Sequence, residues 1–145
     1  MTNLSIWFKE HRDIAIEVLR IYLGIGLLIK GIQFMLNQDL PIEYMARVSL
    51  PFFDFLLLHI VAIVHIAGGF LLAIGLISRI AALIQVPILA GAIFFVHLQQ
   101  GLFTKEQSLE FVILVLLLLL VFVVYGGGRL SVDYAIEKKI SSSTK

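Results

Sequence analysis

Four long apolar stretches constrain this chain more than any other feature of its sequence. They lie at residues 14–36, 54–77, 80–98 and 108–125. A helix needs about 20 apolar residues to cross the hydrocarbon core of a bilayer, and each stretch has roughly that length. The chain of 145 residues is 60% hydrophobic and only 14% charged, which leaves too little polar surface for a soluble domain. The pattern therefore predicts an all-α fold, an integral membrane four-helix bundle.

The same pattern predicts the domain organisation. We expect a single four-helix transmembrane domain over residues 1–140 and a polar tail at 141–145. The second and third stretches are separated by little more than Ser78 and Arg79, which predicts a tight antiparallel hairpin. In the third stretch, Pro87 should kink the helix because it frees a backbone carbonyl.

A short cytoplasmic helix is expected after the fourth stretch. The glycines at 126–128 end the preceding helix, and Ser131 is placed to cap the next one. Asp133 in the first turn of this helix, and Lys138 and Lys139 in its last turn, would complement the helix dipole.

Basic residues beside the stretches predict the orientation. The side of the membrane that holds both termini carries seven of them: Lys9, Arg12, Arg79, Arg129, Lys138, Lys139 and Lys145. The other side carries Arg47 and Lys105. Since basic residues accumulate in cytoplasmic loops, we expect both termini to face the cytoplasm. The first stretch contains charged residues and lacks a cleavage site for a signal peptide, so we expect it to be retained as a membrane span.

Composition excludes several classes of function. The chain contains no cysteine, which excludes disulfides, thiolate nucleophiles, cysteine-ligated metals and iron–sulfur clusters. A formal net charge of +1 gives no basic patch for nucleic acid. Any redox chemistry would therefore need a bound cofactor.

Small and polar residues share one face of the first stretch. Arg20, Gly24 and Gly31 recur at helical spacing, and Glu17 lies about one turn before Arg20. The glycines predict close helix packing, because small residues let backbones approach. For Arg20 two interpretations stay open. It either reaches the cytoplasmic headgroups or pairs with Glu17, or it anchors an anionic headgroup or cofactor.

The second stretch carries a similar seam with a histidine near the middle of the membrane. His65 shares a face with Ala62, Gly69 and Ala73, and Gly68 lies beside them. A polar side chain at that depth needs a partner. The partner is either a neighbouring helix or a ligand or proton path.

Several ionisable residues are expected in the outer third of the bundle. At 1.5 Å per residue, His59 and His97 lie about 25 to 27 Å from the cytoplasmic ends of their helices. Lys30, Asp54 and Glu110 are expected at a similar level. These groups either sit at the headgroups, line a pocket for a quinone or another small molecule, or provide bis-histidine ligation of haem or metal. No His-x-x-x-His or Glu-x-x-His spacing supports ligation, so haem is disfavoured and no metal site is predicted.

Three stretches of the sequence, in order, resemble the DoxX-like family of small four-helix bacterial membrane proteins. The first is Leu19-Arg20-Ile21-Tyr22-Leu23-Gly24 with Lys30-Gly31. The second runs from His65 through Gly68-Gly69 to Gly75-Leu76-Ile77-Ser78-Arg79-Ile80-Ala81. The third is Gly126-Gly127-Gly128-Arg129-Leu130-Ser131-Val132-Asp133, similar to the family's glycine–Arg–Leu–Ser–x–Asp ending. Two positions depart from the family pattern: His65 stands where many relatives have glutamate, and Gly127 where many have proline.

The resemblance implies a bacterial inner-membrane location and a link to quinone-dependent oxidoreductase assemblies. It supplies no agreed catalytic residues, and His65 places any carboxylate-based mechanism in doubt. The sequence therefore does not decide whether the chain is an enzyme. We expect an accessory subunit supporting quinone-linked electron transfer, in contact with other membrane subunits. The candidate ligand-binding residues are Arg20, Lys30, His59, His65, His97 and Glu110.

Two other functions stay open. The fourth stretch has no polar side chain from Phe111 to Val124, so much of its surface should face lipid or a partner subunit. This favours a structural subunit or assembly factor of a larger membrane complex. Transport of a small solute is the weaker alternative, because no pair of broken helices is evident in the sequence.

Overall fold

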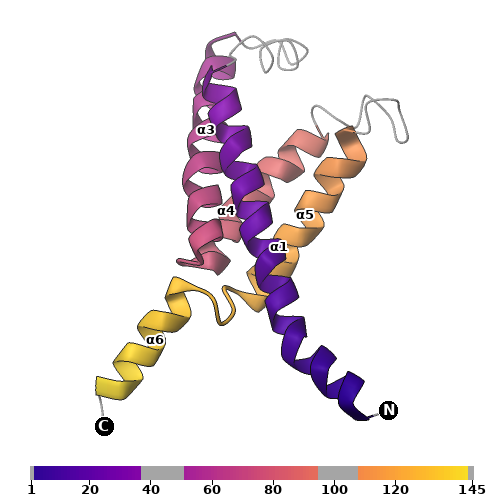
Figure 1. Ribbon diagram of the computed structural model, residues 1–145. Helices are drawn as coiled ribbons and strands as arrows, with labels where there is room; N and C mark the ends of the chain where they lie inside the picture. The colour runs from indigo at the N-terminus through magenta and orange to yellow at the C-terminus, as the bar shows by residue number, and fades with distance from the viewer. Residues whose placement is uncertain (1, 37–50, 95–107, 144–145) are drawn as a thin grey trace.

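The computed structural model describes residues 2–36, 51–94 and 108–143 (Figure 1). This part of the chain forms five α-helices and no strands, which confirms the predicted all-α class. The helices are α1 (Thr2–Leu36), α3 (Pro51–Ile74), α4 (Ser78–Ala92), α5 (Ser108–Tyr125) and α6 (Val132–Ser143). Over these described residues, no helix combines the length and the apolar character that crossing a membrane requires.

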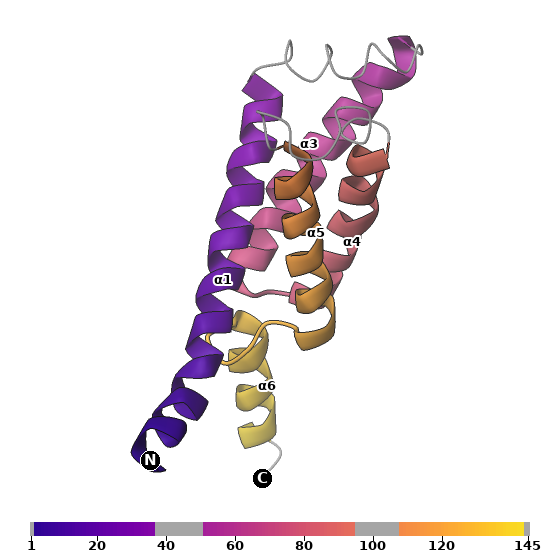
Figure 2. The same ribbon diagram turned by 90° about the vertical axis from the view of Figure 1, so that its right-hand side faces the viewer.

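The bundle consists of two antiparallel helix pairs. α1 packs along α3 in the largest interface, and α4 packs along α5 (Figures 1 and 2). α3 also contacts α4, whereas α1 and α5 touch over a small area. Both chain termini lie at the same end of the molecule, where α6 leaves the bundle (Figures 1 and 2). We call this the terminal end.

Glycines set the close approach of α1 and α3. A Cβ atom on Gly69 would lie 2.5 Å from the backbone nitrogen of Leu28, and one on Gly31 would lie 2.7 Å from that of Ile66. A Cβ atom on Gly24 would likewise overlap the α3 backbone. Any larger residue at these three positions would therefore push the two helices apart.

The interior between the helix pairs is mostly aliphatic. Gly68 on α3 faces α4, where an added Cβ atom would lie 2.7 Å from Nε2 of Gln85. Apolar side chains from four helices pack together to form the core, which comprises Leu23, Leu27, Leu72, Ala82, Leu89, Leu119 and Phe122.

The helix ends differ in places from the apolar stretches. α1 begins at Thr2, well before the apolar residues begin, because a helix can continue through polar sequence. α3 ends at Ile74, since Gly75 takes a left-handed conformation with a φ of 76°. α4 is described to Ala92, and the remainder of the expected stretch lies mainly outside the described residues. The bounds of α5 are those expected.

The short helix after the bundle is present as α6. Its cap is confirmed, because the Ser131 hydroxyl accepts a hydrogen bond from the backbone N–H of Tyr134 at 3.1 Å. The prediction for Lys138 and Lys139 was wrong. The helix continues to Ser143, so neither lysine lies in its last turn.

Candidate functional site

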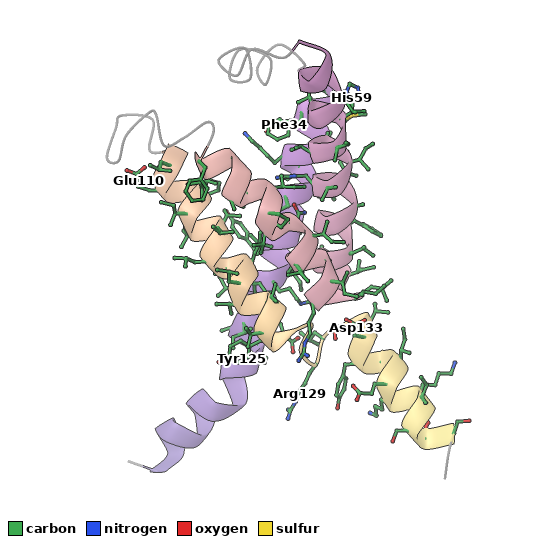
Figure 3. The ribbon with its side chains drawn as sticks, turned by 180° about the vertical axis from the view of Figure 1, so that it is seen from behind. Phe34, His59, Glu110, Tyr125, Arg129 and Asp133 are labelled. Atoms are coloured by element: carbon green, nitrogen blue, oxygen red, sulfur yellow. The ribbon has the colours of Figure 1, made fainter. Side chains whose placement is uncertain are left out.

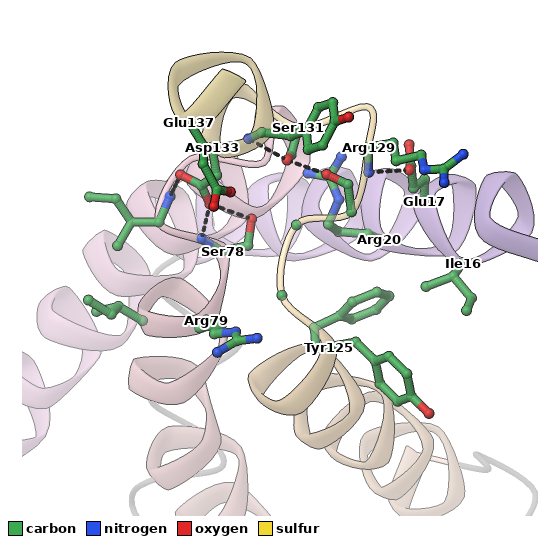
Figure 4. Close-up of a pocket in the computed structure, with 17 residues that line it drawn as sticks. Ile16, Glu17, Arg20, Ser78, Arg79, Tyr125, Arg129, Ser131, Asp133 and Glu137 are labelled. Atoms are coloured by element: carbon green, nitrogen blue, oxygen red, sulfur yellow. Dashed lines mark hydrogen bonds between the residues drawn. The ribbon is translucent and has the colours of Figure 1, made fainter. Parts of the chain in front are cut away.

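Ionisable side chains from two segments far apart in the chain meet at the terminal end. Glu17 and Arg20 come from α1, and Asp133 comes from the first turn of α6 (Figure 4). We call these three residues the terminal cluster. They line a cavity of about 780 Å³ that also contacts the start of α4 and the end of α5.

Glu17 fixes the loop that leads into α6. Its side chain is only 3% exposed, and its two carboxylate oxygens accept the backbone N–H groups of Arg129 at 2.5 Å and Leu130 at 2.7 Å. Gly128 lies against it with a φ of 70°, and a Cβ atom there would lie 2.9 Å from Cγ of Glu17. The buried carboxylate is thus satisfied by backbone donors, which lets this charge exist in the interior.

Arg20 joins the end of α3 to the same loop. It is 1% exposed, and its Nη1 donates a hydrogen bond to the carbonyl of Leu72 at 2.7 Å. Its Nη2 donates to the carbonyl of Leu130 at 3.1 Å. The last carbonyls of a helix have no partner within the helix, and they carry partial negative charge. Arg20 therefore caps the C-terminus of α3 from a neighbouring helix.

Asp133 caps the N-terminus of α4 in the same manner. Its Oδ1 accepts the N–H of Ile77 at 2.8 Å, and its Oδ2 accepts the N–H of Ser78 at 3.1 Å. In return, the N–H of Asp133 donates to the carbonyl of Gly75 at 3.1 Å. Ile77 has a φ of 50°, an unfavourable conformation for a β-branched residue. The hydrogen bonds of Asp133 hold this strained turn in place.

Arg20 is buried, and its hydrogen bonds described above go to backbone carbonyls rather than to Glu17. The sequence predicted that Asp133 interacts with the dipole of its own helix, and it gave no indication of the contact with α4. The signal that could have found these residues was their presence within the motifs shared with the DoxX-like family.

A second polar group lies within the α1–α3 pair. His65 is 6% exposed, and its Nδ1 lies 2.9 Å from the carbonyl oxygen of Val61. Because a carbonyl can only accept, Nδ1 carries the hydrogen and Nε2 of a neutral ring is an acceptor. The ring of Phe34 meets the His65 ring edge-on at 5.9 Å between centroids, and Nζ of Lys30 lies 5.2 Å from the Phe34 centroid. We call Lys30, Phe34 and His65 the central group.

Gln85 was not singled out by the sequence, although it is fully buried between α3 and α4. Its Nε2 donates to the carbonyl of Val64 at 3.2 Å. Its Oε1 has no hydrogen-bond partner among the described residues. No periodic pattern marks a single glutamine in an apolar helix, so the sequence gives little signal for it.

The remaining candidates belong to the end opposite the termini. His59 on α3 and Glu110 on α5 lie on opposite sides of the molecule (Figure 3), so the structure does not bring them together. His97 and the side chain of Asp54 lie outside the described residues. Within the described ranges, no set of three His, Asp or Glu side chains is arranged to hold a metal ion.

Comparison with known proteins gives one match. A sequence model of the family described as DoxX matches residues 15–98, from α1 to a position beyond the end of α4. No curated protein and no solved structure matches the chain. The matched segment contains Glu17, Arg20 and the central group, and it ends before Asp133.

Proposed function

This chain belongs to the DoxX family, and we propose that it is a multi-pass inner-membrane protein that supports quinone-linked oxidoreductase activity as an accessory subunit. Family membership supports the membrane location. The mean hydropathy of +1.02 supports it as well. Arg79, Arg129, Lys138 and Lys139 all belong to segments at the terminal end, which favours a cytoplasmic position for both termini.

The central group is the observation that carries the quinone proposal. A quinone headgroup is a flat ring with two carbonyl oxygens, and its reduced form has two hydroxyls. Lys30 can donate a hydrogen bond to a quinone oxygen, and Nε2 of His65 can accept one from a quinol hydroxyl. Phe34 lies close to both of these polar groups and offers an aromatic surface to the ring. Lys30 is exposed and Phe34 is partly exposed, so a ligand can approach from the side of the bundle.

In this proposal the residues bind a quinone and do not themselves carry electrons. The electrons would be transferred by a partner subunit of the membrane oxidoreductase. Arg20 is not assigned to the ligand, because its hydrogen bonds are used within the fold. His59 and Glu110 are not assigned either, since the structure places them apart at the opposite end.

The proposal is tested in two steps. Alkaline extraction of membranes from expressing cells should leave the protein in the pellet if it is integral. The purified protein in nanodiscs should then bind a short-chain quinone, measured by native mass spectrometry and equilibrium dialysis. His65→Ala and Lys30→Ala should each weaken binding about tenfold, the effect of one lost hydrogen bond of ordinary strength.

A matched control is Gln33→Ala, an exposed position on α1 that is not part of the central group. It should leave quinone binding unchanged. Absence of quinone binding in the wild-type protein, or equal loss in the control, would remove the quinone role.

One observation favours a second function, a structural subunit of a larger membrane complex. α5 presents a row of exposed apolar side chains at helical spacing, namely Phe111, Leu114, Leu117, Val121 and Val124. Such a face suits lipid or another apolar helix. Purification in mild detergent should then yield a stoichiometric partner, and Leu117→Gln should release it. Quinone binding that depends on His65 and Lys30 would instead favour the first function.

A further inference from the structure

We infer that the cavity at the terminal end binds the phosphate group of an anionic membrane lipid, and that Arg79 is its main ligand. This inference rests on the proposed membrane location and orientation, but not on quinone binding. The cavity lies where α4 begins and α5 ends (Figure 4). In the proposed orientation, that level corresponds to the cytoplasmic headgroups.

The terminal cluster does not provide the ligand for the phosphate. The oxygens of Glu17 and Asp133 accept hydrogen bonds from backbone N–H groups, so their charges are already stabilised within the fold. Arg20 is buried and donates to carbonyls at both of its terminal nitrogens. These three residues shape the wall of the cavity and hold its segments together.

Arg79 differs from Arg20 both in its exposure and in its hydrogen bonding. It is exposed in the first turn of α4, and no hydrogen bond or ion pair links it to another described residue. A guanidinium group binds phosphate through two parallel N–H donors, which makes arginine the preferred residue for such contacts. An exposed arginine that lines a cavity and has no internal partner fits that use.

Arg79 lies beside Gly126, the glycine that follows α5. A Cβ atom on Gly126 would lie 3.0 Å from Nε of Arg79 and 3.4 Å from its Cγ. The side chain therefore lies along the glycine backbone and extends toward the space between α4 and α5, near Tyr125 (Figure 4).

The lining of the cavity favours a lipid over a free phosphate ion. Beside Arg79 it contains the side chains of Tyr125 and Tyr134, which offer hydroxyl groups. It also contains Ile16, Ile80 and Phe122, which are apolar. Free phosphate would contact only the polar part. A phospholipid presents a charged group and hydrocarbon together, and so it matches both parts of the lining.

Native mass spectrometry in nanodiscs tests the inference with defined lipids. Nanodiscs made of phosphatidylcholine with a minor fraction of phosphatidylglycerol should yield protein that retains phosphatidylglycerol. Arg79→Gln should reduce this retention about tenfold, because it removes a charge-assisted contact. Lys138→Gln removes one positive charge from α6, outside the cavity lining, and should leave retention within about twofold of wild type.

Three outcomes would overturn the inference. Retention unaffected by Arg79→Gln would show that Arg79 is not the ligand. An equal loss in Lys138→Gln would show general attraction to an anionic surface. Competition by inorganic phosphate at millimolar concentration would assign the site to the free ion. Far-UV circular dichroism of each variant verifies that the helices are retained.

Different results would overturn the proposed function and this inference. If the protein is extracted from membranes at alkaline pH, the membrane location is wrong and both proposals fall. If it stays in the membrane and retains phosphatidylglycerol through Arg79 but binds no quinone, the lipid site stands and the quinone role does not.

Discussion

The terminal cluster and the middle of the bundle hold their buried polar groups in different ways. Glu17 and Asp133 each accept backbone N–H groups from a distant segment at both oxygens, and Arg20 donates to carbonyls of two segments. His65 and Gln85 each bond one carbonyl of α3. Oε1 of Gln85 has no partner among the described residues, and in the terminal cluster the same is true of Nε of Arg20.

The difference follows from where each region lies along its helices. Helix ends expose N–H and C=O groups that have no partner within the helix, so a charged side chain placed there gains several hydrogen bonds at once. The middle of a helix offers only carbonyls that are already bonded along the helix axis. Polar side chains that reach the ends of other helices or the loop before α6 therefore stabilise the fold, whereas His65 and Gln85 each bond a single carbonyl within α3.

The largest effect is expected for Arg20→Ala. The substitution leaves Glu17 as a buried carboxylate near Asp133 without the positive charge between them, and it frees two carbonyls. Loss of one member of a buried charged group typically costs about 3 to 5 kcal/mol. Unfolding in mixed detergent micelles, followed by far-UV circular dichroism, should show this loss. Lys30→Ala on the same helix is the control and should change the free energy of unfolding by less than about 1 kcal/mol, as is usual for exposed sites.

Glu17→Gln should have an intermediate effect. The amide keeps the shape of the side chain but has one oxygen, so its NH₂ group would face a backbone N–H. We expect a loss of about 2 kcal/mol, typical of a hydrogen bond to a charged group. Hydrogen exchange should accelerate at the amides of Arg129 and Leu130 and stay unchanged in α4. Glu137→Gln, an exposed carboxylate in the same cavity, should not alter exchange at these amides.

Asp133→Ala should cost less, about 1 kcal/mol, which is the usual loss for a helix N-cap. It removes the acceptor for the N–H groups of Ile77 and Ser78, and water can replace it in part because Ile77 is exposed. Exchange should accelerate at these two amides. Unchanged protection there would show that Asp133 does not hold the turn between α3 and α4.

Local signals in the sequence were enough for much of the fold. The bounds of α5 follow from its apolar run, and the cap of α6 follows from Ser131 beside the glycines. The glycine seam of α1 and α3 follows from the spacing of small residues. In each case the residues that form the feature are neighbours in the chain or recur at helical spacing.

The terminal cluster could not be derived in this way. Asp133 contacts Ile77 across 56 residues of sequence, and Glu17 contacts Arg129 across 112. Such pairs depend on how the segments pack, which helical periodicity does not encode. Estimates of depth from helix length were also incomplete, because they give the level of a residue along the bundle but not the side on which it lies. They placed His59 and Glu110 at one level but could not specify the side of the bundle on which each lies.

The smallest change in the free energy of unfolding is expected for a substitution of Gln85, in the middle of the bundle. Gln85→Met keeps a long unbranched side chain while removing an amide whose Oε1 has no partner in the described structure. Among the described residues, the bond lost is the one to the carbonyl of Val64, which lies inside α3 and can still accept from the helix. Removing a half-satisfied polar group from an apolar site is often neutral or stabilising, so the free energy of unfolding should stay within about 1 kcal/mol of wild type or rise. A loss as large as that expected for Glu17→Gln would mean that Gln85 is as fully used as the terminal cluster, and the contrast between the two regions would then fail.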